Sequence, residues 1–371
     1  MKIYPFQAIY PNFDLIPSPE IFFSSGNYDF SEHQKNGFFR KSGDDSIYIY
    51  VINAKHRSHV GLVACVDVRS YIEGTIVQHE KTLATKEQMM MQAFLKRQAM
   101  MNPVLLGYET DSRLDQMIAG IVKDCEPFFS INFEEDDQKH HFFRVQDKKL
   151  LNRICHLFEK KVERAYIADG HHRFVTGAKL FQTKSSKFDR SHKYQYILCA
   201  FFPFNQLEIH DYNRVVHALG DISTAKLFAK MSRVFDIKYL RRPQKPKRKH
   251  ELTMYLQHEW YRLRWRTKIL KKYHRNHTVL LDTHLLNKEV MNKIVGIQDF
   301  CVDPRLTYVP GILGLRGLIE RINAQANSFG FCLYPIKKQD WISIANKGES
   351  MPPKSTWFEP RIRNGMVVKV F

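Results

Sequence analysis

The densest polar group in the sequence is Asp169-Gly170-His171-His172-Arg173, which follows a short apolar run. This order predicts a strand that turns into a helix, with Gly170 at the turn. The first amides of a helix have no partner within it, and the helix dipole adds partial positive charge there. Arg173 can donate two parallel hydrogen bonds to phosphate oxygens, and the two histidines add donors whose charge varies near neutral pH. The group therefore predicts an anion-binding turn.

Two other interpretations of this group stay open. Asp169 could simply cap the helix, with both histidines at the surface. A metal site made by His171 and His172 is less well supported, because adjacent side chains on a helix point in different directions.

A second polar group, His79-Glu80-Lys81-Thr82, is expected on a loop between a strand and a helix. Loops on a rigid scaffold often carry function. Glu80 could act as a general base, with His79 contacting a phosphate or the substrate. An ordinary polar loop is the alternative.

A third group, Lys354-Ser355-Thr356, follows two prolines that stiffen the chain. It offers one cation and two hydroxyls for a substrate. It lacks the glycine-rich approach of a Walker A loop, so it is not one. Its simplest interpretation is a turn that enters a strand.

Residue type and spacing predict the elements that must position these groups. We expect strands over residues 46–52, 61–67, 166–168 and 194–202, and helices over residues 85–101, 147–163 and 171–181. Thr85 is expected to cap the first helix. Its methionine stripe (Met89, Met90, Met91, Met100 and Met101) is expected to pack in the core rather than to face a cofactor.

The C-terminal half shows a similar mixture without strict alternation. We expect helices over residues 282–295, 314–326 and 338–346, a strand over 329–335, and a hairpin over 254–266 around a Gln-His-Glu turn. A mixture of this kind predicts an α+β protein in two parts, with the seam near residues 220–250.

Composition narrows the class of protein. The 371 residues carry 57 Lys and Arg against 38 Asp and Glu, a formal charge of +19 that favours anionic partners. Residues 241–275 alone hold 13 basic residues and two Glu, which is typical of a solvated linker leading into a basic hairpin and leaves a nucleic-acid or acidic-partner surface as an alternative. The six cysteines form no CxxC pair, and no run of about 18 apolar residues predicts a membrane span. We expect a cytoplasmic protein without membrane contact.

Taken together, the polar groups resemble one family. It is the SerK-like family of uncharacterised domains, relatives of the free L-serine kinases with a ParB/sulfiredoxin-like nucleotide-binding core. The segments that carry the resemblance start at residues 5, 66, 79, 102, 167, 211 and 351, and include His-Glu-Lys-Thr, Asp-Gly-His-His-Arg and Pro-Pro-Lys-Ser-Thr.

The resemblance implies a fold and a domain division. Residues 1–220 would form the ParB/sulfiredoxin-like catalytic core with N-terminal strands. Residues 221–371 would form an additional mixed α/β domain that contains the basic segment and the Pro-Pro-Lys-Ser-Thr loop.

It also implies a small-molecule kinase that uses ATP or ADP with Mg²⁺ to phosphorylate free L-serine, as in serine biosynthesis. Glu80 would be the catalytic base. Asp169 would hold the metal or the substrate amine.

The other roles follow from the same resemblance. Gly170, His171, His172 and Arg173 would bind the nucleotide phosphates. The substrate would contact His79, Thr82, Lys354, Ser355 and Thr356. The resemblance assigns no specific metal ligands.

Departures from the family pattern leave alternatives open. After Thr82 the family often has Lys-x-Asp-Arg, whereas this chain continues with Lys86-Glu87-Gln88-Met89. A non-catalytic nucleotide-binding regulator and a ParB-like nucleic-acid-binding protein are the other hypotheses, the second less favoured. The acceptor, the nucleotide and the oligomeric state stay open.

Overall fold

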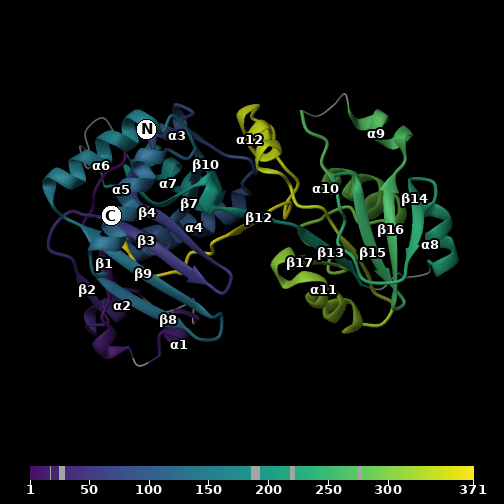
Figure 1. Ribbon diagram of the computed structural model, residues 1–371, viewed down its shortest axis with the longest axis horizontal. Helices are drawn as coiled ribbons and strands as arrows, with labels where there is room; N and C mark the ends of the chain where they lie inside the picture. Colours follow the sequence, from purple (N-terminus) through teal and green to yellow (C-terminus); the bar gives the residue numbers. More distant parts are fainter. Residues whose placement is uncertain (17, 25–29, 185–192, 218–221, 275–277) are drawn as a thin grey trace. The chain divides into compact units, whose positions relative to one another are not determined.

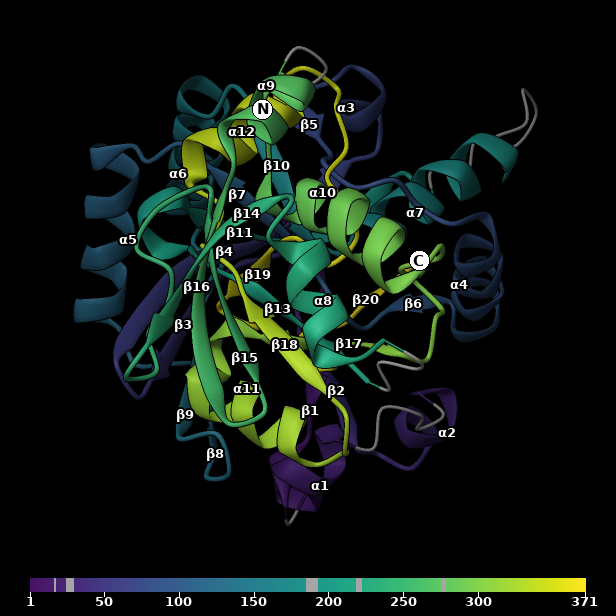
Figure 2. The same ribbon diagram turned by 90° about the vertical axis from the view of Figure 1, so that its right-hand side faces the viewer.

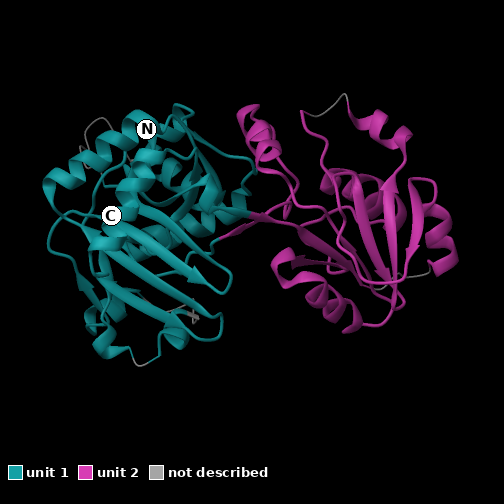
Figure 3. Cartoon of the chain, viewed as in Figure 1, with its two compact units in different colours: residues 1–208, 360–371 teal, residues 209–359 magenta. Residues whose placement is uncertain are grey.

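The computed structural model describes residues 1–371 except 17, 25–29, 185–192, 218–221 and 275–277 (Figure 1). The chain forms two compact units. Unit 1 holds residues 1–208 and 360–371, and unit 2 holds residues 209–359 (Figure 3). Each combines helices with a sheet, so the mixed α/β character is confirmed, while the ParB/sulfiredoxin-like type stays a prediction.

Unit 1 is built on an eight-stranded mixed sheet in the order β5-β10-β7-β11-β4-β3-β9-β8. Its strands are β3 (Ile47–Ala54), β4 (Arg57–Asp67), β5 (Ile76–Val77), β7 (Val104–Tyr108), β8 (Phe129–Phe133), β9 (Gln138–Val145), β10 (Ala165–Asp169) and β11 (Tyr196–Pro203). Four of these, β3, β4, β10 and β11, are the strands predicted from sequence. Strand β11 runs parallel to β7 and antiparallel to β4, and it is apolar and buried along nearly its whole length, as a central strand must be.

The helices of unit 1 are α1 (Pro19–Ser24), α2 (Phe30–Lys35), α3 (Arg69–Ile72), α4 (Ala84–Arg97), α5 (Ser112–Asp124), α6 (Lys148–Lys161) and α7 (His171–Lys184), with short 3₁₀ turns η1 (Phe13–Leu15) and η2 (Phe204–Gln206). Helices α6 and α7 both pack on strand β11. Phe158 of α6 meets Phe201 with ring centroids 5.2 Å apart, and Gly177 of α7 lies against Ile197. Asp147 caps α6 by accepting a hydrogen bond from an amide of its first turn, as a cap must to satisfy a free donor.

Helix α4 differs from its prediction at both ends. It begins at Ala84 after Leu83, whose side chain makes no cap, so Thr85 lies inside the first turn and is not the cap. It ends at Arg97, because Gln98 adopts a left-handed backbone with φ +52°. Met100 therefore lies in a short strand, β6 (Ala99–Met100), and not in the helix.

The last residues of the chain return to unit 1. Strand β20 (Lys369–Val370) pairs antiparallel with β6, and Val368 exchanges backbone hydrogen bonds with Ile9 of β1 (Ile9–Pro11), which itself pairs with β2 (Phe39–Lys41). The expected domain of residues 221–371 thus differs from the observed units, because backbone pairing holds residues 360–371 to the N-terminal strands. The expected boundary at 220/221 lies outside the described residues, and the units divide at 208/209.

Unit 2 is built on a six-stranded antiparallel sheet in the order β14-β16-β15-β18-β13-β17. Its strands are β13 (Tyr212–Val216), β14 (Phe235–Leu240), β15 (Glu251–Leu256), β16 (Glu259–Trp265), β17 (Leu306–Pro310) and β18 (Phe329–Cys332). The helical elements are α8 (Thr224–Met231), α9 (Thr267–His274), α10 (Asp282–Leu285), η3 (Leu286–Val295), η4 (Gly311–Leu313), α11 (Gly314–Asn323) and α12 (Lys338–Asn346), and β12 (Glu208–His210) pairs with β19 (Trp357–Glu359).

The two faces of this sheet bury separate cores, as the alternation of side chains along a strand requires. Val216 faces a core completed by α8, α9, α10 and η3, whereas its neighbour Val215 faces a core completed by α11. Figure 2 looks onto unit 2, with α8 over the first of these faces.

The predicted hairpin is confirmed as β15 and β16. Gln257 and His258 connect the strands with φ +49° and +66°, the positive values of a two-residue type I′ turn. The predicted helix 282–295 is α10 followed by the π-helical turns of η3, and helix 338–346 matches α12. Within the described part of the chain, no helix has both the length and the apolarity needed to cross a bilayer.

Candidate functional site

The turn between β10 and α7 confirms the predicted strand-to-helix arrangement. Gly170 has φ +95°, a left-handed conformation that side chains disfavour. A Cβ atom there would also lie 2.6 Å from Nη2 of Arg173, which packs back against the turn. The backbone conformation therefore favours glycine at this position, and a side chain there would also displace the guanidinium of Arg173.

The loop with His79 and Glu80 meets this turn. It follows β5, and β5 runs parallel to β10, so the carboxyl ends of the two strands lie at the same edge of the sheet. His171 Nε2 lies 3.3 Å from His79 Nδ1, with the two rings edge to face. His171 Nδ1 lies 4.0 Å from Glu80 Oε2. His171 thus forms one cluster with Glu80 and with His79, which lies 92 positions earlier in the chain.

The two clustered histidines are neutral at physiological pH. Burial lowers the pKa of His171 to about 3, and burial followed by the neighbouring His171 lowers the pKa of His79 well below its usual value. The expectation that His171 titrates near neutral pH is therefore wrong. It can donate or accept a hydrogen bond, but it brings no positive charge to a phosphate.

Positive charge at the turn comes from arginine. Arg173 Nη2 donates to Asp169 Oδ2 at 2.8 Å, and Arg361 Nη1 lies 3.6 Å from Asp169 Oδ1. Burial raises the pKa of Asp169, but the two nearby guanidinium groups together lower it by more. The pKa of Asp169 is therefore below its usual range. Asp169 is thus neutralised by two arginines, which suits it to orient Arg173 better than to bind a metal or an amine.

A cavity of about 430 Å³ lies beside this turn. It is lined by Lys86, Met89, Met90, Ala93, Phe94, Arg97, Ala99, Met101, Asn102, His172, Arg173 and Asn364. Its volume falls within the roughly 300–1,000 Å³ of small-molecule sites, and it joins an apolar wall to several cationic or polar side chains, as such sites do.

Met89, Met90 and Met101 line this cavity. The assignment to the core is wrong for Met89 and Met90, whereas Met100 is buried as predicted and Met101 packs against a core cluster. Met89 is exposed, and Met90 is only partly buried. One face of α4 carries Lys86, Met90 and Arg97 at helical spacing. This pattern was the only indication of the cavity wall in the sequence. The spacing was the same as that of a core stripe, and only the flanking Lys86 and Arg97 distinguished it.

Thr82 serves the fold of the site. Its hydroxyl donates to buried Glu87, which also accepts a hydrogen bond from Lys179 of α7. These hydrogen bonds, with Lys179 first, lower the pKa of Glu87 below its usual value. The contact joins the start of α4 to α7, so Thr82 positions the two cavity walls.

The third predicted group belongs to unit 2. Lys354 is exposed, and its Nζ lies 5.3 Å from the ring centroid of Tyr212. The buried Ser355 hydroxyl lies 2.6 Å from the Pro352 carbonyl oxygen and 3.1 Å from the Thr283 hydroxyl, and Thr356 is buried too. These hydroxyls hold the local loop together, and the substrate roles of Lys354, Ser355 and Thr356 stay predictions.

A metal ion would have few protein ligands at the candidate site. Among the residues that the structure describes, no group of three or more His, Cys, Asp or Glu could hold one.

Comparisons with known proteins give a family and distant structural likenesses. The family model described as "Protein of unknown function (DUF1015)" matches residues 10–285. A search of curated proteins found no match.

Three solved structures illustrate the likeness. "SbnI with C-terminal truncation from Staphylococcus aureus" is 12% identical with a TM-score of 0.43, over 81% of this chain and 85% of that one. A free serine kinase mutant in complex with ADP is 10% identical with a TM-score of 0.42, over 83% and 91%. A conserved hypothetical protein from Pyrococcus furiosus is 11% identical with a TM-score of 0.40, over 83% and 95%. TM-scores below 0.5 do not establish a shared fold, so the site rests on its own geometry.

Proposed function

The chain belongs to this family of unknown function, and we propose that unit 1 binds a nucleotide and transfers a phosphoryl group from it to the hydroxyl of a small metabolite. The observation that carries the proposal is the position of Glu80. Its carboxylate lies 4.0 Å from His171, the first residue of α7, at the turn where an anion would bind.

The cavity of about 430 Å³ beside α7, called the methionine cavity below, is suited to bind the nucleotide. Its apolar wall from α4 offers Met90 and Phe94 to a base, and thioethers make favourable contacts with aromatic rings. His172 and Arg173 of the first turn of α7 line the same cavity. Arg173 and the amides of that turn would bind the phosphates. Lys86 and Arg97 add positive charge on its α4 side.

Phosphoryl transfer needs positioning and charge neutralisation more than covalent chemistry from the protein. Glu80 would accept the proton of the acceptor hydroxyl. Neutral His171 would orient that carboxylate, and His79 would hold His171 in place through the 3.3 Å contact. The motif resemblance to the free L-serine kinases makes L-serine the first acceptor to test.

Mg²⁺ fits this site only as an ion held mainly by phosphates. Such ions commonly keep phosphate oxygens and waters as most of their ligands, so they need only one or two carboxylates from the protein. When bound, the ion would neutralise charge on the phosphates.

Nucleic-acid binding is supported less well by the charges of unit 2. Several cations of the basic segment are paired within the unit: Lys245 lies 3.5 Å from Asp211, Lys249 lies 3.0 Å from Asp340, and Arg264 bonds Glu251 at 3.0 Å. Paired charges release fewer counterions on binding a phosphate backbone. A nucleotide-binding regulator without turnover remains the second candidate, because the cavity alone would serve it.

The test is a transfer assay with purified full-length protein, Mg²⁺, L-serine, and ATP or ADP, read by mass spectrometry of O-phosphoserine. Glu80→Gln is expected to lower the rate by roughly 10²–10⁴-fold, the usual contribution of a general base, while nucleotide affinity is kept. Glu73→Gln removes the same charge from an exposed position and is expected to leave the rate unchanged.

The outcomes separate the candidates. Nucleotide binding without phosphoserine, with no other hydroxylated acceptor converted, would favour the regulator. A Glu80→Gln variant as active as the unchanged protein would refute the role of Glu80.

A further inference from the structure

Arg214 in strand β13 is a buried cation to which the described residues offer no carboxylate partner. Its side chain has no exposed surface and is among the largest fully buried groups in the described chain. Burial lowers its pKa to about 10, so it is still charged at neutral pH. The groups that favour its charged form are Tyr308 and Tyr212, and no described carboxylate is among them. A buried charge left unpaired is costly, and native proteins normally pair it.

One edge of this guanidinium has no hydrogen-bond partner. Nη1 donates to the Tyr212 carbonyl oxygen, but Nε and Nη2 have no partner among the described residues. Nε and Nη2 lie on the same edge of the group, and their parallel donors match the two oxygens of a carboxylate. The orphaned atoms are therefore the pair that a carboxylate would engage.

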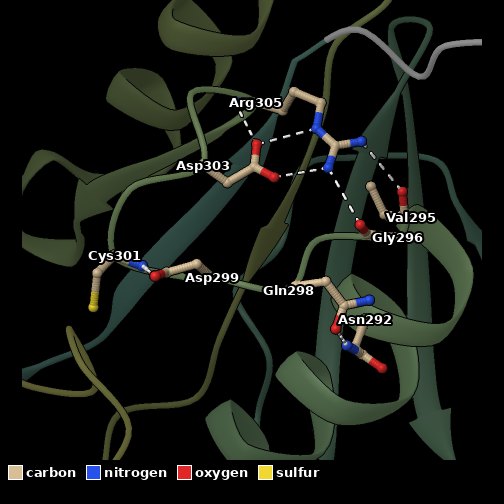
Figure 4. Close-up of polar contacts among 8 residues, drawn as sticks. All are labelled: Asn292, Val295, Gly296, Gln298, Asp299, Cys301, Asp303 and Arg305. Atoms are coloured by element: carbon tan, nitrogen blue, oxygen red, sulfur yellow. Dashed lines mark hydrogen bonds and ion pairs between the residues drawn. The ribbon is translucent and has the colours of Figure 1, made fainter.

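Arg305 in the same unit shows this edge occupied. Its Nε donates to Asp303 Oδ1 at 3.0 Å and its Nη2 to Asp303 Oδ2 at 2.7 Å (Figure 4). Nη2 also lies 3.3 Å from the Gly296 carbonyl oxygen at the end of η3. Among the described residues, Arg214 thus has no carboxylate partner of the kind that Asp303 provides to Arg305.

The surroundings of Arg214 are aromatic and cationic. Its Cζ lies 4.6 Å from the ring centroid of Tyr308, and the rings of Tyr308 and Tyr212 are 6.1 Å apart. Lys354 is exposed, and its Nζ lies 5.3 Å from the ring centroid of Tyr212. The nearest acid along the strand, Asp211, faces the other side of the sheet by strand alternation and meets Lys245.

We propose that Arg214 is the anchor of an anion site in unit 2 that binds a small carboxylate. The carboxylate pairs with the Nε–Nη2 edge, the tyrosine rings limit its size, and Lys354 adds positive charge at the entrance. Tyr308 is half-buried and covers the guanidinium, with its hydroxyl donating to the Phe300 carbonyl oxygen at 2.6 Å. The ligand enters by displacing this ring.

The test is calorimetric titration of the full-length protein without nucleotide, at ionic strength held constant with chloride. The probes are L-serine and lactate, with lactamide as the uncharged analogue of lactate and inorganic phosphate as the other anion. Both carboxylates are expected to bind and lactamide is not. No nucleotide is present, so phosphoryl transfer does not enter the result. L-serine is also the acceptor proposed for unit 1, so only the carboxylate binding that substitution of Arg214 removes is assigned to the site in unit 2.

Variants separate a ligand site from a structural arginine. Arg214→Met is expected to weaken carboxylate binding at least about tenfold, as loss of charged hydrogen bonds implies, and to leave the ligand-free melting temperature equal or higher. Arg316→Met makes the same change at a largely exposed side chain of α11 and is expected to leave affinity within about twofold.

Three results would overturn the proposal. They are a wild-type protein that binds neither carboxylate, a protein that binds phosphate but no carboxylate, and an Arg214→Met variant with unchanged affinity. Should Arg214→Met not fold, Lys354→Gln decides, since that position is exposed. Its affinity is expected to fall roughly two- to fivefold, and an unchanged affinity would also overturn the site.

Discussion

At the scale of single residues, His171 links the two halves of the candidate site. One ring nitrogen faces His79 and the other faces Glu80. Sequence placed both polar groups next to strands, and the parallel pairing of β5 with β10 brings them together. The neutral state of His171 could not be predicted, because it depends on burial that only the packed structure supplies.

That neutral state has a measurable consequence. The pKa of His171 is about 3 in the folded protein and near 6.5 when unfolded, so below pH 6.5 the unfolded chain binds a proton that the folded chain does not. The free energy of unfolding therefore decreases as the pH is lowered from about 6.5 toward 3. From this group alone we expect a loss of about 2 kcal/mol between pH 6.5 and 4.5.

The measurement is urea unfolding at several pH values. His171→Gln is expected to remove about that much of the acid dependence, whatever its stability at pH 7. His56→Gln alters an exposed histidine and is expected to keep the full dependence. His140, buried with a pKa of about 3, contributes equally in all three proteins. Identical slopes for His171→Gln and the unchanged protein would show that His171 is not buried neutral.

At the scale of elements, the approach of α7 to the sheet positions the whole site. Gly177 allows this approach, because a Cβ there would lie 2.3 Å from Cδ1 of Ile197 on β11. Gly120 of α5 has no atom within 4 Å of its Cβ position. Gly177 and Gly120 are both inside helices, so the same Gly→Ala substitution can be compared at a packed and at an open position.

We expect Gly177→Ala to destabilise the protein by roughly 1–3 kcal/mol, because Ile197 must move or α7 must shift. Gly120→Ala is expected to stabilise it by about 0.5–1 kcal/mol through the lower backbone entropy cost in a helix. Chemical denaturation with a common m-value measures both. A stabilised Gly177→Ala variant would contradict the close packing of α7 on β11.

Most elements were predictable because their patterns are local. Strand β11 is an apolar run, α12 shows helical spacing, and the turn at Gln257 joins two alternating strands. Met89 and Met90 of α4 were wrongly assigned to the core, since helical spacing identifies an apolar face but not whether that face meets a core or a cavity, whereas Met100 is buried as predicted.

At the scale of the whole molecule, the return of residues 360–371 to unit 1 was not predictable. It depends on pairing of Val368 with Ile9 and of Lys369 with Met100, contacts between segments far apart in the sequence. The same return brings Arg361 to Asp169 and Asn364 to the cavity wall. Neither residue carried a local signal, so sequence reasoning missed both.

The net charge of the chain is a weaker guide to its ligand than the sequence suggested. The formal charge of +19 suggested an anionic partner, but the basic segment of unit 2 is partly neutralised by ion pairs such as Lys249 with Asp340. The candidate site instead joins a few cations to a defined cavity. Local arrangement is therefore a better guide to the ligand than net charge.

The central claim is that a nucleotide occupies the methionine cavity at the start of α7. Calorimetric titration of ADP into three full-length proteins tests it most directly: the unchanged chain, Met90→Glu and Gln92→Glu. Both variants add one negative charge to α4, but Met90 lines the cavity and Gln92 is exposed on the helix and does not line it. We expect Met90→Glu to weaken ADP binding at least about tenfold and Gln92→Glu to change it by less than about threefold. Equal affinities of the two variants, or no binding of ADP to the unchanged chain, would contradict the account.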